Sequence, residues 1–341
     1  MTYDKKRSVR HNGAGRFCLF AALLLAGCRQ PEAPIQLQGE AQGTYYSISY
    51  YDSQRRDLQP QIDSLLSAFD QTASLWVDSS LLQRINANIT DTVDPLFADM
   101  FDKSQQISRY TDGAFDVRIG RLVQVWGFSF KQREEPDSAT IAGLLAAAHA
   151  DVEIIDGHIS KTNPATEIDF NAIAQGYSVD MLAAMFDSLG IANYLIDVGG
   201  EVIARGCKPD GKPWRVGIER PAVDSISQPV IQTAIALRNA SVVTSGSYRK
   251  YYEKDGMRYS HTIDPSTGRP VEHTLLSVSV VEQSAWLADA MATAYMVMGL
   301  DHARAFIDAH PDGPGTDAVL FIYDDGGTLK EYATKGFKKL Q

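Results

Sequence analysis

LLSVSVVEQSAWLADAMATAYMVM, residues 275–298, joins a strand signal directly to a helix signal. Residues 275–281 alternate as a strand does, and residues 284–298 follow as a helix. Elsewhere in the chain we predict strands at 39–51, 193–198, 214–219, 231–237 and 257–263, hairpins at 153–160 and 318–332, and helices at 58–69, 95–108, 137–149 and 176–189. Because strands and helices are interspersed and several strands are joined by tight turns, the sequence predicts an α+β fold with a mixed, largely antiparallel sheet and packed helices.

Residues 1–27 have the order of a bacterial lipoprotein signal peptide: a basic region, a short apolar run and a small-residue cleavage site. The apolar run, residues 17–26, is far shorter than the ~20 residues that a membrane-spanning helix needs. Cys28 follows Leu-Ala-Gly directly, so we expect it to be the lipidated first residue of the mature chain. A buried cysteine after a chance apolar run is the alternative. Residues 28–38 are then predicted to be a tether, and residues 39–341 a single domain.

The charge of the chain argues against some partners. The formal net charge is −10, and residues 1–27 carry five basic and one acidic side chain, so the mature chain is near −14. Nucleic acid is therefore not an expected partner, because its phosphates need a basic face. The lipid on Cys28, rather than a polybasic patch, would hold the protein at a membrane. Cys207 is the only cysteine left beyond Cys18 and Cys28, so no internal disulfide is predicted.

Two polar turns follow apolar strands in the middle of the chain. In DFNAIAQGY, residues 169–177, a helix opens after a short loop and offers free N–H groups to an anion. In DVGGE, residues 197–201, two glycines permit a ligand to approach the backbone closely. An ordinary capped helix and an ordinary hairpin turn would give the same patterns. A Rossmann dinucleotide site has little support, because the chain has no G-x-G-x-x-G.

A third polar cluster combines TSGSYR, residues 244–249, with SHTIDPSTGRP, residues 260–270. The Asp-Pro-Ser-Thr-Gly part of the second segment is typical of a turn. His261 lies three residues before Asp264 and could act as an acid or a base. A structural histidine beside a turn is the alternative.

A fourth cluster, ADAMATA at residues 288–294, places Asp289 and Thr293 four residues apart on one face of the predicted helix. A carboxylate and a hydroxyl stacked in this way suit Mg²⁺, which prefers oxygen ligands and keeps positions open for phosphate. The alternative is a small-residue helix that packs closely on a sheet. Asp289 would still need a partner there, because an unpaired buried carboxylate is costly.

In this order, the clusters resemble the motifs of the ApbE family, whose members are FAD:protein FMN transferases. The resemblance covers nearly all of the mature chain and includes several further stretches upstream. These are QGTY at residues 42–45, SLWV at 74–77, the segment 80–86, GAFD at 113–116 and WGF at 126–128.

The resemblance implies that FAD is the substrate, bound in an extended form with Mg²⁺ at its diphosphate. The FMN half would pass to a Ser or Thr hydroxyl in a motif of an acceptor protein, with release of AMP. By position, the implied metal ligands are Asp289, Thr293 and backbone oxygens near Ala172 and Ala292. The implied FAD contacts are Gln42, Trp76, Ala114, Phe115, Asp116, Asp169, Gln175, His261 and Ile263. The catalytic residues implied are Asp289 and His261, the latter as the group that deprotonates the acceptor hydroxyl.

Three residues depart from the family pattern. Gln42 replaces a Met, so the packing against the flavin or the adenine is expected to differ. Trp76 replaces a Tyr, which keeps a stacking face but changes the hydrogen-bonding tip. Gln175 replaces a Lys and removes a cation near the nucleotide.

Two other functions fit the same motifs. A Mg²⁺-dependent FAD diphosphatase, which gives FMN and AMP, would differ only in using water as the acceptor. A non-catalytic periplasmic FAD-binding lipoprotein would have less need of Asp289, Thr293 and His261. We therefore expect a transferase of the cell envelope, lipid-anchored to a bacterial membrane and facing the periplasm. Its acceptors would be proteins of membrane-associated electron-transfer complexes.

Overall fold

The computed structural model describes Met1 and residues 33–127, 136–221, 230–246, 251–254, 257–260 and 262–341. The chain divides into two units, Met1–Glu32 and Ala33–Gln341, and the elements below belong to the second. Cys28, predicted to carry a lipid, and His261, the candidate base, lie outside the described residues. Within the described part of the chain, no helix is long and apolar enough to cross a bilayer.

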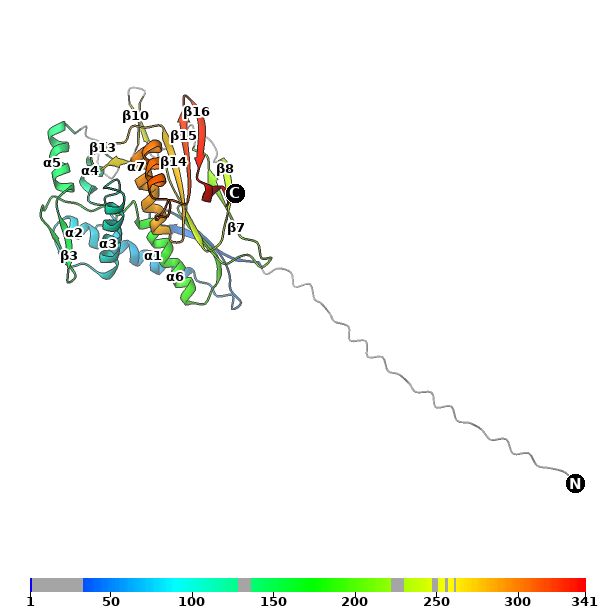
Figure 1. Ribbon diagram of the computed structural model, residues 1–341. Helices are drawn as coiled ribbons and strands as arrows, with labels where there is room; N and C mark the ends of the chain where they lie inside the picture. Colours follow the sequence, from blue (N-terminus) through cyan, green and yellow to red (C-terminus); the bar gives the residue numbers. More distant parts are fainter. Residues whose placement is uncertain (2–32, 128–135, 222–229, 247–250, 255–256, 261) are drawn as a thin grey trace. The chain divides into compact units, whose positions relative to one another are not determined.

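An eight-stranded sheet forms the centre of the second unit (Figure 1). Its strands, in order across the sheet, are β1 (Ile35–Ala41), β2 (Thr44–Tyr51), β5 (Asn193–Val198), β6 (Glu201–Arg205), β9 (Ala240–Gly246), β14 (Leu275–Glu282), β15 (Ala318–Asp325) and β16 (Thr328–Ala333). Every neighbouring pair in this sheet is antiparallel. The predicted α+β class with a largely antiparallel sheet is therefore confirmed.

The strand and helix predicted at residues 275–298 are β14 and α7 (Ala285–Ala309). β14 lies between β9 and β15, and α7 packs back onto β14 and β9. The helix runs beyond the predicted end, with a kink at Gly299, where φ is 71°. His273 Nε2 lies 2.7 Å from the carbonyl oxygen of Met296, next to this kink. The helix therefore continues past Gly299 only because glycine accepts a positive φ.

Both faces of the sheet are covered. On one face, α1 (Gln59–Ala73), α3 (Pro95–Tyr110), α6 (Ala174–Ser188) and α7 form the larger core with the inward-facing strand residues. On the other face, the hairpin of β7 (Trp214–Glu219) and β8 (Ile231–Leu237), together with α8 (Lys335–Lys338), covers a second core. Val202 and Ile203 illustrate the result, because both are buried although they point to opposite faces.

Most of the remaining elements extend the helical side of the unit, whereas β10 lies at the end of the central strands (Figure 1). They are α2 (Leu81–Asn86), α4 (Gly120–Val125), α5 (Ser138–Ala148) and the strand pairs β3 (Val152–Ile155) with β4 (His158–Lys161), β10 (Tyr251–Lys254) with β11 (Met257–Ser260), and β12 (Ile263–Asp264) with β13 (Arg269–Pro270). α4 and α5 enclose a small core with Trp126 and Ile263. Asp137 caps α5, because its Oδ1 accepts a hydrogen bond of 2.7 Å from Thr140 N–H.

Two predictions near the start of the domain need correction. The single strand predicted at residues 39–51 is divided by a turn at Gln42 and Gly43, both with positive φ, into the end of β1 and the whole of β2. The boundary of the tether also differs. We expected residues 28–38 to be a tether, but β1 begins at Ile35. Ile35 pairs with Tyr50 and Leu37 pairs with Ile48, so these residues belong to the edge of the central sheet. The strand extends this far because Ile35 and Leu37 alternate with polar residues and pack against the larger core.

Candidate functional site

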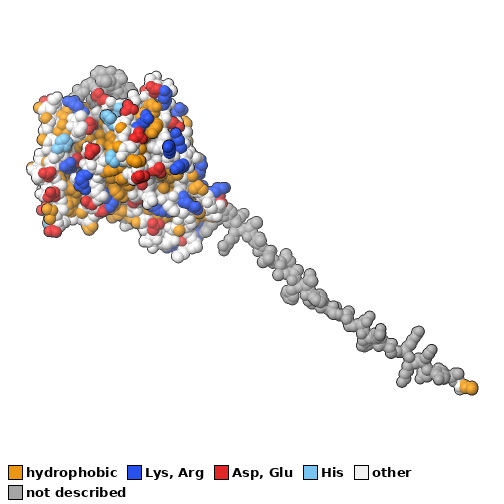
Figure 2. Space-filling model, in the orientation of Figure 1, with side chains coloured by type: hydrophobic (Ala, Val, Ile, Leu, Met, Phe, Trp, Pro, Cys, Tyr) orange, Lys and Arg blue, Asp and Glu red, His pale blue; other side chains and the backbone are white. Residues whose placement is uncertain are grey.

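A cleft of about 1420 Å³ lies at the ends of the central strands and reaches between the helical elements and the β7 strand. It is lined by the β1–β2 turn, the start of α6, the β5–β6 turn, the end of β9 and one face of α7. Pockets for small ligands usually have about 300–1,000 Å³, so this cleft has room for an extended dinucleotide. Figure 2 shows acidic and basic side chains interspersed on the visible face rather than one continuous basic surface.

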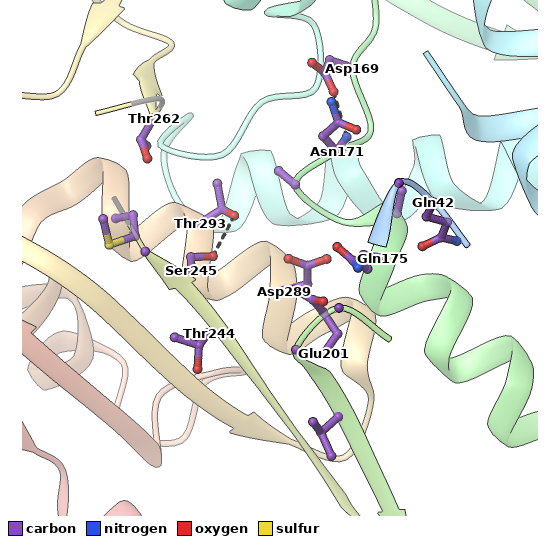
Figure 3. A pocket seen from close by; sticks show the side chains of 18 of the residues that line it. Gln42, Asp169, Asn171, Gln175, Glu201, Thr244, Ser245, Thr262, Asp289 and Thr293 are labelled. Carbon is purple, nitrogen blue, oxygen red and sulfur yellow. Dashed lines mark hydrogen bonds between the residues drawn. The ribbon is translucent and has the colours of Figure 1, made fainter. Parts of the chain in front are cut away.

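Asp289 and Thr293 line this cleft from the same face of α7, as their spacing predicted (Figure 3). Asp289 is buried, and its Oδ2 accepts a hydrogen bond of 3.0 Å from the backbone N–H of Gly176. Burial raises the pKa of Asp289 to about 7, and the Gly176 hydrogen bond offsets only part of this effect. Thr293 Oγ1 lies 3.3 Å from Ser245 Oγ at the end of β9. A buried carboxylate with so little compensation favours a cation beside it.

The start of α6 positions Asp289. The sequence predicted that this helix start offers N–H groups to an anion, and one of them, at Gly176, binds the Asp289 carboxylate. A Cβ atom at Gly176 would lie 2.7 Å from the Ala285 carbonyl carbon and 2.8 Å from Asp289 Cβ. Glycine is therefore required for α6 to approach α7 closely enough for this hydrogen bond.

The donor atoms around Asp289 fit a hard cation. Among the described residues, no group of three or more His, Cys, Asp or Glu side chains could hold a metal ion. A cation here would therefore be bound by one carboxylate, by hydroxyl and backbone oxygens, and by oxygens from water or substrate, which is the arrangement typical of Mg²⁺. Ala172, a predicted backbone ligand, lines the cleft. Ala292, the other one, is fully buried in α7 and does not line it.

Asp169 and Asp116 place two further carboxylates in the cleft wall. Asp169 is buried, and desolvation raises its pKa to about 6, while the Asn171 N–H at 2.8 Å acts in the opposite direction. Asp116 instead forms a two-pronged ion pair with Arg118, with distances of 2.6 Å (Nη2–Oδ2) and 3.0 Å (Nε–Oδ1). The two acids therefore differ: Asp116 has a fixed countercharge, whereas Asp169 is held in a poorly solvated position.

The stretch before Asp116 is structural. Phe115 is buried in the larger core, and its backbone N–H donates to Thr111 Oγ1 at 3.2 Å. Neither Phe115 nor Ala114 lines the cleft, although both were predicted to contact FAD. The motif GAFD therefore contributes one cleft residue, Asp116, and uses Phe115 to anchor it.

Gln42 and Gln175, two of the departures from the family pattern, lie near each other in the cleft wall (Figure 3). Gln42 occupies the β1–β2 turn with φ 56°, and its Oε1 lies 3.3 Å from Ser178 Oγ. Gln175 Nε2 donates to the carbonyl oxygen of Val198 at 3.1 Å. A Cβ atom at Gly199 would collide with this amide, so the glycine of the DVGGE turn makes room for Gln175.

Of the other residues predicted to contact FAD, some line the cleft and one lies outside the described residues. Trp76 lines the cleft with 52 % of its surface exposed, and an indole ring is a side-chain group on which a flat ligand can stack. Ile263 also lines the cleft and is buried in β12. His261 lies outside the described residues, as does Cys28.

Sequence reasoning missed two parts of the cleft. Ser245 was within the TSGSYR motif but was not selected, and its contact with Thr293 could not be found without knowing that β9 and α7 are packed together. Residues 215–219 of β7 also line the cleft, and they carry no motif beyond an ordinary strand pattern.

Comparisons with known proteins agree with the motif order. A model of the ApbE family matches residues 42–319. An FAD:protein FMN transferase of Vibrio cholerae is 36% identical over 94% of this chain and 96% of its own length. One from Escherichia coli is 35% identical over 94% of this chain and 95% of its own length.

Solved structures show the same similarity. The flavin transferase ApbE from Vibrio cholerae has a TM-score of 0.78 at 34% identity, covering 91% of this chain and 100% of that one. The apo form of Pseudomonas stutzeri flavinyl transferase ApbE has a TM-score of 0.81 at 30% identity, covering 92% of this chain and 98% of that one. The similarity therefore extends over nearly the whole described unit.

Proposed function

Because this chain belongs to the ApbE family, we propose that it transfers the FMN half of FAD to a hydroxyl group of an acceptor protein. The acceptor oxygen forms a bond to the FMN phosphorus, and the bond from that phosphorus to the bridging oxygen of the diphosphate breaks. AMP leaves with the bridging oxygen, and the hydroxyl proton passes to a base. The curated relatives that match over nearly their full length are FAD:protein FMN transferases.

The observation that carries the proposal within the structure is the pair of Asp289 and Thr293 in the wall of a dinucleotide-sized cleft. Asp289 is buried, and burial raises its pKa. Such a group is typical of a functional site rather than of a solvent-exposed surface. The rest of the wall supplies a stacking face at Trp76 and polar groups at Gln42 and Gln175, which suit a ligand such as FAD, whose flat rings are joined by a polar chain.

Mg²⁺ is part of the proposal. Asp289, Thr293 and a backbone oxygen near Ala172 would hold it, and the low local solvation of Asp289 supports this assignment. When bound there, the ion would neutralise charge on the diphosphate oxygens. The start of α6 fixes the Asp289 carboxylate through Gly176, so the protein holds this ligand in place before substrate arrives.

The acceptor is proposed to offer a Ser or Thr hydroxyl. Such a hydroxyl needs a base at the moment of attack, and the family resemblance assigns this role to His261. A neutral imidazole suits that role near neutral pH.

The proposed location is the cell envelope. Residues 1–27 have the pattern of a lipoprotein signal peptide, and Cys28 is the proposed site of lipidation. The lipid would hold the enzyme on the periplasmic side of a membrane, where it would meet subunits of membrane-associated electron-transfer complexes.

One incubation separates this proposal from its two alternatives. The mature protein is mixed with FAD, Mg²⁺ and an acceptor domain that carries a Ser/Thr-Gly-Ala-Thr motif, and the products are separated by chromatography. FMN covalently attached to the acceptor, with one AMP per attached FMN, supports the transferase. Free FMN and AMP with unlabelled acceptor would identify a diphosphatase, and unchanged bound FAD would identify a carrier.

A further inference from the structure

One strand of the cleft wall lies at the edge of its sheet in the part of the chain that the structure describes. β7 forms a two-stranded sheet with β8, and within the described residues it pairs with no other strand. β7 is nevertheless firmly placed, because Trp214 and Ile218 are buried in the second core. The ring of Trp214 also packs on that of Tyr51, with centroids 5.9 Å apart.

The register shows which backbone groups point to this edge. Ala236 of β8 lies opposite Arg215 of β7, and its N–H donates to the carbonyl oxygen of Leu340 at 2.8 Å, on the side of β8 away from β7. In an antiparallel pair, two opposite residues either exchange both of their backbone hydrogen bonds or point their N–H and C=O groups away from the partner strand. The N–H and C=O of Arg215 therefore point away from β8, and those of Gly217, two residues further on, do the same.

The outward edge of β7 borders the candidate site. Residues 215–219 line the same cleft as Asp289 and Thr293. Gly217, in the middle of the strand, presents no side chain there, and a glycine inside a strand often marks the close approach of another backbone. The nearest atom to a Cβ at Gly217 would be Cδ1 of Ile231 at 2.8 Å, the far end of a flexible side chain. Packing alone therefore gives little reason for glycine at this position.

We propose that the acceptor polypeptide binds to the open edge of β7 as an additional strand. The inference rests on the proposed function, because that function requires a protein segment to bring a hydroxyl into this cleft. An extended polypeptide is the class of ligand that matches alternating N–H and C=O groups along a strand, and strand addition to a free edge is a general mode of peptide recognition. The side chains of the added strand would alternate, so that one face of the segment presents its hydroxyl to the cleft.

The test uses a pair of variants at one position. Gly217→Pro removes the outward N–H but no bond to β8, and proline is tolerated on edge strands. Gly217→Ala is the matched control, since it adds the same Cβ and keeps the N–H. With saturating FAD and Mg²⁺, we expect the KM for the acceptor domain to be about fivefold to tenfold higher in Gly217→Pro than in Gly217→Ala. This is the effect expected from one lost hydrogen bond and from the bulk of the proline ring at the strand edge. FAD affinity should be the same in both variants.

Two outcomes of the variant test would overturn the inference. Equal acceptor KM values for the two variants would show that the edge is not used. A parallel loss of FAD affinity in Gly217→Pro would assign the edge to the nucleotide instead.

Hydrogen–deuterium exchange gives a second measurement that needs no variant. In wild-type protein without FAD, saturating acceptor domain should slow exchange in peptides that cover Trp214–Glu219. If exchange there is unchanged although the acceptor binds, and the acceptor is labelled normally once FAD is added, then the acceptor does not bind at the edge of β7. The proposed transferase activity would still stand. Failure of wild-type protein to label any acceptor would overturn the proposed function and this inference with it.

Discussion

At the level of single residues, the candidate site is marked by acidic side chains in the cleft wall. Asp289 and Asp169 both have a pKa raised by burial, to about 7 and about 6. Asp116, in the same wall, has Arg118 as its partner. The sequence indicated all three acids through their motifs. The sequence could not distinguish their environments. The hydrogen bond of Asp289 depends on tertiary packing, and the ion pair of Asp116 depends on the local backbone conformation.

We expect Asp289→Asn to abolish the binding of Mg²⁺ while leaving the fold intact. The amide oxygen can still accept the Gly176 N–H, but it lacks the charge that attracts a cation. In wild-type protein, millimolar Mg²⁺ should raise the melting temperature through binding to the native state, and in the variant this rise should disappear. FMN transfer should fall about 100-fold or more. An unchanged Mg²⁺-dependent rise in the variant would place the metal elsewhere.

We expect Asp169→Asn to remove the loss of stability that the Asp169 carboxyl causes as pH rises. The pKa of Asp169 is raised from 3.8 to about 6 in the folded protein, so the folded state holds this proton more tightly than the unfolded state. The stabilisation is complete below pH ~4 and is lost as pH rises through about 6. Relative to the variant, the free energy of unfolding of wild-type protein should fall by up to about 3 kcal/mol between pH 4 and 7. Urea unfolding at several pH values would measure this, and a difference that is constant with pH would contradict it.

At the scale of elements, the site is made by the contact between α6 and α7. Gly176 allows the two helices to approach, and its N–H binds Asp289 across that contact. α6 has no side-chain cap, so the carboxylate of another helix occupies part of its N-terminus. A change in the spacing of these helices would therefore alter stability and the position of the metal ligand together.

We expect Gly176→Ala to destabilise the protein by about 1–3 kcal/mol, because its Cβ would overlap the Ala285 carbonyl group and Asp289 Cβ. Gly143→Ala, in the middle of α5, is the matched control. No atom lies within 4 Å of a Cβ at that position, so it should be neutral or stabilise by up to about 1 kcal/mol. Chemical denaturation of both variants measures the contrast. Equal effects would show that the α6–α7 approach is not as tight as the structure has it.

The elements also show where sequence-based prediction succeeds. β14 and α7 were predicted because alternation and helical spacing are local signals. The position of β7 beside the cleft was not predicted, because Arg215 and Gly217 acquire their role only when the hairpin folds over the second face of the sheet. Phe115 was assigned to FAD by motif alone, although its apolar ring is better satisfied in the core.

At the scale of the whole molecule, the earlier start of β1 shortens the proposed tether. Only residues 29–34 separate Cys28 from Ile35, the first residue of the central sheet. Fully extended, this connection spans at most about 25 Å, at ~3.5 Å per residue. A lipid on Cys28 would therefore keep the catalytic unit close to the membrane and restrict the acceptors it can reach.

We expect Cys28→Ala to release the protein from the membrane fraction without changing its activity on a soluble acceptor domain. The substitution removes the proposed lipidation site but no residue of the folded unit 33–341. Fractionation of cells and an assay of each fraction measure both effects, with Cys207→Ala as the control that keeps Cys28. Membrane association of the Cys28→Ala variant equal to that of wild type would show that another feature holds the protein there.

FMN transfer by this protein is tested most simply by the intact mass of the acceptor domain after incubation with FAD and Mg²⁺, followed by fragmentation to locate the attachment. We predict that wild-type protein adds one FMN, joined through its phosphate, to the Ser or Thr hydroxyl of the acceptor motif. Asp289→Asn, or an acceptor in which that hydroxyl residue is replaced by Val or Ala, should give unmodified acceptor. An unmodified acceptor with wild-type protein, or equal labelling by Asp289→Asn, would contradict the account.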